Sequence, residues 1–586
     1  MKQFLITVAG VIVGLVLFLV VAPIVVISMI ASSMTNTPAA PQHMVLEIDL
    51  REPLTDQRPL SPFASWSGGQ NVLDIVTRLH AAAEDGRVKG VYVRAAANGM
   101  APAHAEEIRA ALAAFQQSGK FVVGHIQNEG VRMSMAGYSA VAGADELWLQ
   151  GVSEFMPMGL SSEQVFFGDT LRRYRLQPQF ETREEFKSAA DMLTQTGFTG
   201  PNRQQTQELL GSLYDIMLRH IAQDRGVSAQ AARAAVESTP VTGQRAIELK
   251  LIDRLGQPEE AERSALARAG DEAELVSIGA YAPPIQGGGP TIAVVTGEGE
   301  ILGGADDSGP FGDAQLMRGD AVARALLDAS EDEDVRVILF RVSSPGGSVV
   351  ASDQILAALR TARERGKRVV VSMGDVAASG GYYVAAEADE IVANPTTITG
   401  SIGVVGGKIV IGPALEHYLS ARTDTIAVGS PLITMFSADA PFTPAGREAF
   451  ASFIDRAYQE FMQRVAEGRD LTVAQVRDVA RGRVWTGEQA RQRGLVDHLG
   501  GFSTAVDRAR VLADVKANER VQLKFFPAAR TPLEELQQFF GASAESARAA
   551  MMLGAIVGDE RVAAIIRAAR ENEAGLRARA EGVTVR

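Results

Sequence analysis

The chain has 586 residues, of which 46% are hydrophobic and 22% are charged, an ordinary balance for a globular protein of several domains. Its net charge of −13 argues against a nucleic-acid partner, because a phosphate backbone requires a basic surface. The absence of cysteine excludes disulfides, thiolate chemistry and cysteine-ligated metals. Only nine lysines are present, and unlike arginine a buried lysine can lose its proton near neutral pH.

The first feature along the chain is an uncharged run of 28 residues, from Phe4 to Ala31. As a helix it would extend about 42 Å, enough to cross a hydrocarbon core of about 30 Å. The run is longer than the apolar part of a cleavable secretory signal, so residues 1–32 are predicted to be an uncleaved membrane anchor that contacts lipid through residues 4–31. Lys2 precedes the run and the next cationic side chain is Arg51, which predicts a cytoplasmic N-terminus and a body outside the cytoplasm. Residues 33–43 are expected to form a linker.

The body of the chain contains an internal repeat. The stretch GYSAVAGADELWL (137–149) resembles GYYVAAEADEIVA (381–393), and TGQRAIELKLIDRLG (242–256) resembles TGEQARQRGLVDHLG (486–500), both at a separation of 244 residues. Further upstream the separation is 247 residues, so the first copy carries three extra residues near 121–136. A nearly constant separation over such a length indicates a duplicated domain.

Each copy alternates strand-like and helix-like segments. In the second copy TIAVVTGEG, VRVILFRV, RVVVSM and DEIVAN are strand-like, and SDQILAALRTARERG is an amphipathic helix between two of them. This alternation predicts an α/β fold with a largely parallel sheet. The expected domains are an N-terminal copy at 44–270, a linker at 271–290, a C-terminal copy at 291–512 and a helical extension at 513–586.

The stretch 371–386 contains the first candidate for chemistry. A β-branched run ends near Val371, Gly374 is expected to break it, and Ser379 follows at a turn before a short helix. A serine at a helix N-terminus is well placed for a nucleophile whose substrate develops an oxyanion, although this stretch by itself favours a helix cap. The N-terminal copy has Met135 at the corresponding position, so only the C-terminal copy retains this serine.

A base for this serine is not evident in the C-terminal copy. His498 lies in a repeated stretch where the other copy has Arg254, which favours a structural role, and no Gly-x-Ser-x-Gly elbow is present. A serine–lysine pair is the alternative. Lys367 and Lys408 are candidates in the same copy, and both are compatible with solvated positions. 

The N-terminal copy offers a further lysine. Lys187 has Pro431 as its counterpart and is therefore not part of the shared scaffold. By itself it could be an exposed residue near Glu184 and Asp191, but a site at the junction of the two copies could combine it with Ser379.

At these residues the sequence resembles the signal peptide peptidase (protease IV) family in its long, two-copy form. The resemblance covers about residues 44–510 and the anchor, and is carried by the segments RVSSPGGSV (341–349), SMGDVAASGGYYVA (372–385), NPTTITGSIGV (394–404) and EFKSAADM (185–192). It implies two tandem crotonase-like (Clp-protease-like) domains after an N-terminal transmembrane helix. It also implies that Ser379 is the nucleophile, Lys187 the general base and Ser401 the residue that orients the lysine amine, with an oxyanion hole formed by the N–H groups of Gly347 and Gly380.

The resemblance further implies a serine endopeptidase of the inner membrane, with its catalytic part periplasmic or extracytoplasmic. The expected partners are peptides, above all cleaved signal peptides, and other copies of the chain in a homotetramer. No cofactor, metal or nucleic acid is expected. Two other functions are compatible with the sequence: a crotonase-type acyl-CoA enzyme, which would share the fold and the paired glycines, and a non-catalytic membrane scaffold.

Overall fold

The computed structural model describes residues 41–58, 70–95, 99–127, 133–284, 288–304, 316–516, 519–528 and 577–579. The predicted anchor, the linker up to residue 40 and the expected helix after Thr531 lie outside these residues. No helix among the described parts of the chain has the length and apolar character needed to cross a membrane.

The N-terminal copy is built on a six-stranded sheet in the order β10-β6-β5-β4-β1-β11. All of its ladders are parallel, as the βαβ pattern predicts. The strands are β1 (Met44–Asp49), β4 (Val88–Ala95), β5 (Phe121–Ile126), β6 (Glu146–Leu149), β10 (Arg254–Leu255) and β11 (Glu274–Ser277). The predicted linker therefore contains an edge strand, β11, which is too short and too exposed to stand out in the sequence.

The C-terminal copy has an eight-stranded sheet, in which β19 (Ile398–Gly400) and β21 (Val484–Thr486) join at the end of β17. The other pairings repeat the N-terminal sheet in the order β22-β18-β17-β15-β12-β23. The strands of this order are β12 (Thr291–Glu298), β15 (Val335–Ser344), β17 (Arg368–Ala378), β18 (Glu390–Ala393), β22 (His498–Leu499) and β23 (Gln522–Phe526). The four strands predicted for this copy are thereby confirmed. The described residues after 513 include the strands β23 and β24 (Arg577–Arg579), so the start of the expected helical extension is a strand of the sheet.

The duplication extends to individual hydrogen bonds. The Tyr138 hydroxyl donates to the carbonyl of Leu251 over 2.7 Å, and the Tyr382 hydroxyl donates to the carbonyl of Leu495 over 2.9 Å. Both pairs are separated by the 244 residues that relate the two sequences. The two domains therefore share one scaffold.

Helices cover both sheets. The described helices are, in the N-terminal copy, α3 (Val72–Glu84), α4 (Pro102–Gln117), α5 (Met135–Val141), α6 (Gly168–Arg173), α7 (Asp191–Thr194), α8 (Gly200–Asp224), α9 (Ala229–Glu237), α10 (Gly243–Glu248) and α11 (Pro258–Ala269). In the C-terminal copy they are α12 (Gly319–Glu331), α13 (Val349–Glu364), α14 (Gly380–Tyr383), α15 (Gly412–Leu419), α16 (Pro444–Arg469), α17 (Val473–Val479), α18 (Gly487–Gln492) and α19 (Phe502–Leu512).

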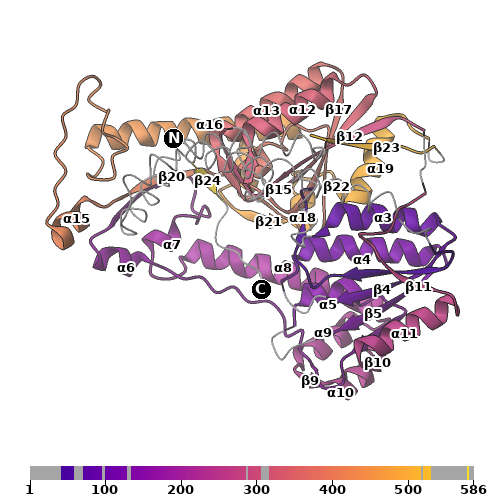
Figure 1. The fold of residues 1–586 in the computed structure, drawn as a ribbon. Helices are drawn as coiled ribbons and strands as arrows, with labels where there is room; N and C mark the ends of the chain where they lie inside the picture. Colours follow the sequence, from indigo (N-terminus) through magenta and orange to yellow (C-terminus); the bar gives the residue numbers. More distant parts are fainter. Residues whose placement is uncertain are drawn as a thin grey trace, which may run out of the picture.

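The two copies are packed through a common core. Helices α3 and α4 lie between the two sheets (Figure 1), and α4 contacts β17 while α3 contacts α19. One continuous cluster of buried side chains therefore includes Leu79 and Phe115 of the N-terminal copy together with Leu339 and Phe502 of the C-terminal copy. The other face of the C-terminal sheet packs against α12 and α13. Burial of apolar area on this scale favours a fixed arrangement of the two copies.

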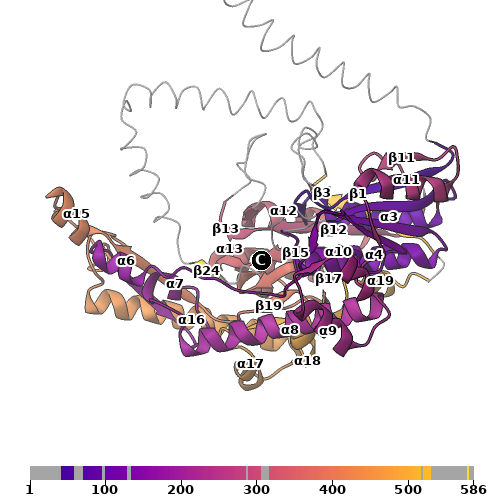
Figure 2. The same cartoon turned by 90° about the horizontal axis from the view of Figure 1, so that it is seen from below.

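An arm extends from this body (Figure 2), made by α6, α7, β8 (Gln177–Thr182) and α8 from the N-terminal copy and by β20 (Val405–Val410), α15 and α16 from the C-terminal copy. Within it β8 and β20 form a two-stranded antiparallel ribbon in which Thr182 pairs with Val405 and Gln177 with Val410. The ribbon joins a segment just before Lys187 to a segment just after Ser401.

Short pairings complete the described strands: β2 (Leu54–Thr55) with β3 (Gln70–Asn71), β7 (Glu154–Phe155) with β9 (Val241–Thr242), β13 (Glu300–Leu302) with β14 (Leu316–Arg318) and β16 (Gly346–Ser348), and β19 (Ile398–Gly400) with β17 and β21 (Val484–Thr486).

Candidate active site

Ser379 lies at the end of β17, immediately before α14. The expected break at Gly374 is wrong: the strand continues to Ala378, with a shift of its register against β15. Gly374 permits this path because a Cβ there would lie 2.6 Å from Asp56 Oδ2 and 3.0 Å from Ser343 Cβ. The strand therefore carries the serine beyond its partner β18 and alongside β19.

The backbone at Ser379 is strained. Its φ is 55° and its ψ is −118°, values that a residue with a Cβ rarely adopts. The Ser379 N–H donates to the carbonyl of Gly400 over 2.9 Å, which holds the residue in this conformation. Ser379 occupies the N-cap position of α14, but its side chain makes no capping hydrogen bond. The hydroxyl is thus available to another partner.

That partner is Lys187. The lysine follows β8 in a turn, and the Phe186 N–H before it donates to the carbonyl of Arg481 over 3.2 Å. Gln205 of α8 supports the turn from the other side, with its Nε2 donating to the carbonyl of Phe186 over 2.9 Å. Gly482 lies against the lysine backbone, since a Cβ on Gly482 would be 2.6 Å from both Lys187 N and Lys187 Cβ. Nothing in the periodicity of the sequence indicates these supports.

Three oxygen atoms surround the Lys187 amine. Nζ lies 2.8 Å from Ser379 Oγ, 3.0 Å from Ser401 Oγ and 3.0 Å from the carbonyl oxygen of Ser401. A neutral amine has two N–H donors and one lone pair, so it satisfies this arrangement by donating twice to Ser401 and accepting the proton of Ser379. The structure therefore brings together the three side chains that were predicted from separate segments.

The Lys187 amine is buried. Lys187 is 4% exposed, and Ser379 and Ser401 are also buried, so the alternative of an exposed Lys187 is wrong. Burial lowers the pKa of Lys187 to about 7. Desolvation disfavours the ammonium form in this way whenever no carboxylate compensates it. A substantial fraction of the amine is then neutral at physiological pH.

The two glycines predicted for an oxyanion hole lie side by side. Gly347 in β16 has a φ of 155°, and a Cβ there would be 2.1 Å from the carbonyl oxygen of Ile301. Gly380 is the first residue of α14, where the N–H has no acceptor within the helix. A Cβ on Gly380 would lie 3.2 Å from Gly347 N, which shows how closely the two backbones approach next to Ser379.

The other predicted candidates lie elsewhere. Lys367 donates to the carbonyls of Asp332 and Val335, and Lys408 donates to three carbonyls that include that of Met435. His498 lies 3.3 Å from Glu390. These are structural contacts. Among the residues that the structure describes, no group of histidines and carboxylates is arranged to hold a metal ion.

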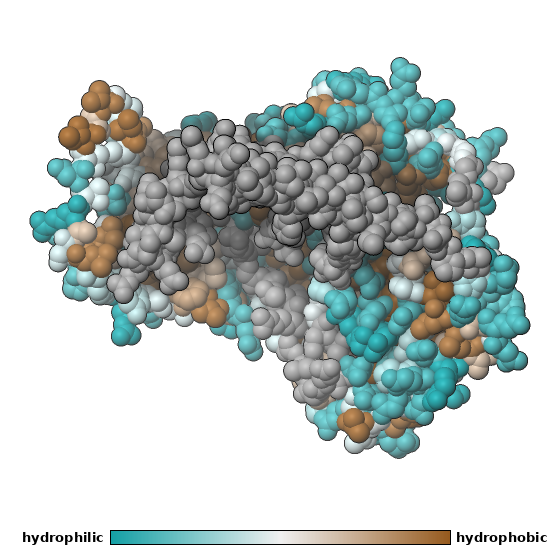
Figure 3. Space-filling view, in the orientation of Figure 1, coloured by the Kyte–Doolittle hydropathy of each residue, from teal (hydrophilic) through white to brown (hydrophobic). Residues whose placement is uncertain are grey.

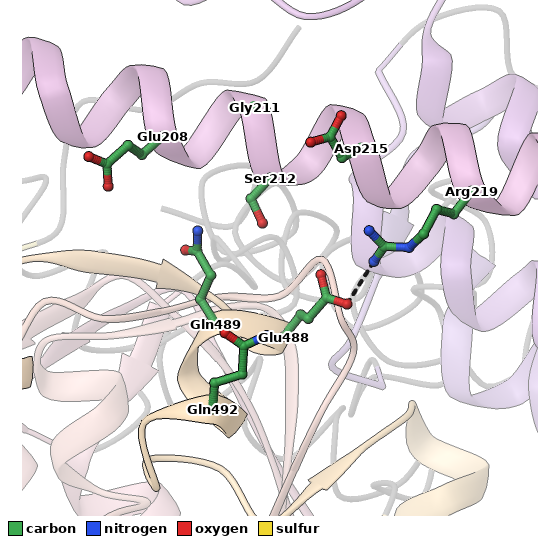
Figure 4. A pocket seen from close by; sticks show the side chains of 8 residues that line it. All are labelled: Glu208, Gly211, Ser212, Asp215, Arg219, Glu488, Gln489 and Gln492. Carbon is green, nitrogen blue, oxygen red and sulfur yellow. Dashed lines mark hydrogen bonds and ion pairs between the residues drawn. The ribbon is translucent and has the colours of Figure 1, made fainter. Parts of the chain in front are cut away.

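A separate polar groove lies where α8 meets α18 (Figure 4). Arg219 of α8 donates to Glu488 of α18 over 2.7 Å, and Ser212 lies 3.0 Å from Thr486. None of the residues around Lys187 lines this groove. It contributes contacts between the two copies.

An α/β protein with a duplicated parallel sheet, in which a buried lysine amine contacts a serine hydroxyl beside two closely packed glycines, has the features of a serine hydrolase. Comparison with known proteins specifies the class. The profile of the family described as "Peptidase family S49" matches residues 114–272 and 361–516, more than half of the chain. The chain belongs to this family and is a serine peptidase.

Individual relatives agree with this assignment. "Protease 4" of Salmonella typhi is 31% identical over 464 residues, which are 76% of this chain and 72% of the relative. "Serine protease SPPA, chloroplastic" of Arabidopsis thaliana is 27% identical over 510 residues, 85% of this chain and 73% of the relative. "Putative signal peptide peptidase SppA" of Enterococcus faecium is 33% identical over 182 residues, 31% of this chain and 52% of that protein.

Proposed function

We propose that this chain is a membrane-anchored serine endopeptidase in which Ser379 is the nucleophile and Lys187 the general base. The observation that carries the proposal is the buried Lys187 amine, 2.8 Å from Ser379 Oγ and with its pKa lowered to about 7 by burial. A serine hydroxyl is a weak nucleophile until a base takes its proton, and only a neutral lysine is such a base. Two copies of a crotonase-like domain, with the boundaries predicted above, supply one member of the pair each.

The reaction follows from these positions. Lys187 Nζ takes the proton of Ser379 Oγ, and Oγ bonds to the peptide carbonyl carbon. The C–N bond then breaks as the Lys187 ammonium returns the proton to the leaving amine, and an acyl-enzyme remains. Lys187 next takes a proton from water, the hydroxide attacks the ester, and the proton returns to Ser379 as the acid leaves. No metal or cofactor takes part in any of these steps.

Two groups assist the pair. Ser401 orients the amine through its hydroxyl and carbonyl, both 3.0 Å from Nζ. The N–H groups of Gly347 and Gly380 stabilise the oxyanion, and one such donor contributes about 3 kcal/mol to transition-state stabilisation. 

The substrates are extended apolar peptides, above all cleaved signal peptides. The edge of β16 supports this proposal, because β24 from the C-terminal segment adds to it as an antiparallel strand, with Gly347 opposite Ala578. A substrate peptide would add to the same edge. A small cavity next to Gly380, lined by Val349, Ser352, Tyr383, Val404 and Phe461 among others, suits a small apolar side chain.

The membrane location rests on residues 4–31. Their 28 uncharged residues are long enough for an uncleaved anchor with a cytoplasmic N-terminus, which would hold the active site on the periplasmic or extracytoplasmic side of the inner membrane. Signal peptides remain in the membrane after cleavage, so an anchored peptidase meets them there.

We also propose that copies of the chain associate in a ring, a homotetramer by family resemblance. Within one chain, 177–182 of the N-terminal copy pairs with 405–410 of the C-terminal copy. The repeat places 421–426 of the C-terminal copy at the position of 177–182, and 161–166 of the N-terminal copy at the position of 405–410. Neither segment forms a strand pairing among the described residues, and the side chains of Val165 and Ile426 are 65% and 96% exposed. Figure 3 shows hydrophobic atoms at the end of the arm near α15. By equivalence these segments would pair between chains, with Ser161 opposite Ile426.

Oligomeric state in detergent tests this pairing. Light scattering on the full chain is expected to give a tetramer, and Ile426→Asp is expected to give smaller species. Val511→Asp, at an exposed site of α19, is the matched control. A tetramer that persists in Ile426→Asp contradicts the predicted pairing.

Peptide hydrolysis tests the proposed chemistry. The wild-type chain should cleave an apolar peptide, and both Ser379→Ala and Lys187→Ala should lose activity by several orders of magnitude. Full activity of Lys187→Ala at neutral pH would contradict the assignment of the base. No hydrolysis by the wild type would favour a scaffold, and binding of coenzyme A would favour an acyl-CoA enzyme.

A further inference from the structure

Two adjacent carboxylates of the N-terminal copy lie buried against the segment that carries Ser401. Glu106 and Glu107 occupy the first turns of α4, and they are 7% and 3% exposed. Their contacts cross to the C-terminal copy, where Asn394 and Thr396 form the turn before β19. Paired carboxylates near the start of a helix are usually solvated, so this burial requires partners.

Glu106 holds the turn through Thr396. One carboxylate oxygen, Oε2, accepts from the Thr396 N–H over 2.9 Å and from the Thr396 hydroxyl over 2.5 Å. The other oxygen, Oε1, lies 3.5 Å from His220 Nε2 of α8. Burial raises the pKa of Glu106 to about 7, against the hydrogen bonds from Thr396 and the positive charge of Arg109.

Glu107 holds the turn through Asn394. Its Oε1 accepts from Asn394 Nδ2 over 3.0 Å, and its Oε2 accepts from the Phe502 N–H over 3.2 Å. It is also ion-paired with Arg341 at 2.7 Å, and that fully buried guanidinium contacts a third N-terminal carboxylate, Asp56. A buried arginine between two carboxylates is a fixed element of the interface.

The 394–397 turn is connected to the residues that contact the Lys187 amine. Thr397 Oγ1 donates to the carbonyl of Gly374 over 2.7 Å, and Thr399 Oγ1 donates to the carbonyl of Ala377 over 2.6 Å. These bonds bind the segment to β17, the strand that carries Ser379. Ser401 follows after β19, so displacement of the turn would move both oxygen atoms that hold Lys187.

The equivalent positions of the C-terminal copy do not make the contact that Glu106 and Glu107 make with the other copy. The counterparts of Glu106 and Glu107, 247 residues later, are Asp353 and Gln354. Asp353 accepts from the hydroxyl of Tyr383 in its own copy over 2.9 Å. The shared scaffold therefore does not require carboxylates that cross to the other copy.

We propose that Glu106 and Glu107 are positioning residues for the reaction: from the N-terminal copy they fix the 394–397 turn of the C-terminal copy, and thereby the Ser401 oxygens that orient Lys187. This proposal rests on the proposed function, since it assigns a role relative to the Lys187–Ser379 pair. The geometry of the active site would then depend on three contacts between the copies: the β8–β20 ribbon, the shared core, and the hydrogen bonds of these two carboxylates to the turn.

Kinetics of the full chain in detergent micelles test the proposal. Glu106→Ala removes the acceptor of both Thr396 donors and is expected to lower kcat about tenfold or more with KM changed by less than about twofold. The midpoint of the acid side of the pH profile, near which both Lys187 and Glu106 titrate, should move by about half a pH unit or more. Glu106→Gln retains an acceptor oxygen and should restore kcat on the pH plateau to near the wild-type value.

Asp85→Asn is the matched control. Asp85 is a buried carboxylate of the same copy that accepts from Arg87 Nη2 over 2.6 Å, and it does not contact the C-terminal turn. It should lower stability without moving the pH midpoint. Folded Glu106→Ala with wild-type kcat and midpoint would overturn the proposal, while an inactive wild type would overturn the proposed function instead. If Glu106→Ala does not fold, Thr396→Val is expected to show the same kcat loss, and its normal kinetics would overturn the proposal.

Discussion

The pH dependence of hydrolysis follows directly from the burial of Lys187. The base must be neutral to take the proton of Ser379, and burial lowers its pKa to about 7. Below this pKa the neutral fraction falls by a factor of about ten for each pH unit, so kcat/KM at pH 6 should be about a fifth of its value at pH 7 and about a tenth of its plateau. With an unperturbed pKa of about 10.4, less than about 0.1% of the amine would be neutral at pH 7.

The assay is the initial rate of cleavage of a quenched apolar peptide between pH 5 and 9, at substrate concentrations well below KM. Ser379→Ala provides the blank at each pH. The expected profile rises with a slope of one and reaches its plateau above about pH 8. A rate that does not fall down to pH 5, or one that keeps rising above pH 9, would refute the neutral-lysine mechanism.

Three further predictions concern the same site. Lys187→Met should stabilise the fold at pH 6 and lose this gain toward pH 10.5. A lysine whose pKa in the folded chain lies about 3.5 units below 10.5 lowers the free energy of unfolding by about 5 kcal/mol below pH 7. An equal gain at pH 6 and pH 10 in urea titrations would contradict this. Gly482→Ala should reduce activity about tenfold or more and destabilise by about 1–3 kcal/mol, since its φ is +72° and its Cβ would lie 2.6 Å from Lys187. Gly494→Ala, at φ +73° with open space around the Cβ, isolates the backbone contribution and should keep normal kinetics. Ser401→Ala should lower kcat about tenfold with little change in KM, and an unchanged kcat would remove Ser401 from the orienting role.

Much of the fold is encoded locally and could be predicted. The β-branched runs of the C-terminal copy and the constant separation of the repeat predict the strands β12, β15, β17 and β18 and a largely parallel sheet in each copy. The edge strands β11 and β23 were missed because they are short and partly exposed, so their partners and not their residues determine them. Gly374 was misinterpreted as a strand end because its role is a close tertiary approach to Asp56.

The site was predictable where the two copies differ. Met135 in place of Ser379, and Pro431 in place of Lys187, distinguish two residues from the shared scaffold. The distance of 2.8 Å between Lys187 Nζ and Ser379 Oγ depends on the β8–β20 ribbon and on Gly482, and the periodicity of the sequence indicates neither contact. Glu106 and Glu107 were missed because adjacent acidic residues on a helix usually face solvent, and only the packing of α4 against the other copy buries them.

Covalent labelling with a fluorophosphonate tests the central claim most directly, because it reports the activated serine without a choice of substrate. The wild-type chain is expected to form a single adduct, mapped by peptide mass to Ser379, at a rate that rises with pH through about 7. Folded Lys187→Met is expected to form none. An adduct on another serine, or labelling of Lys187→Met at the wild-type rate, would contradict an active site shared between the two copies.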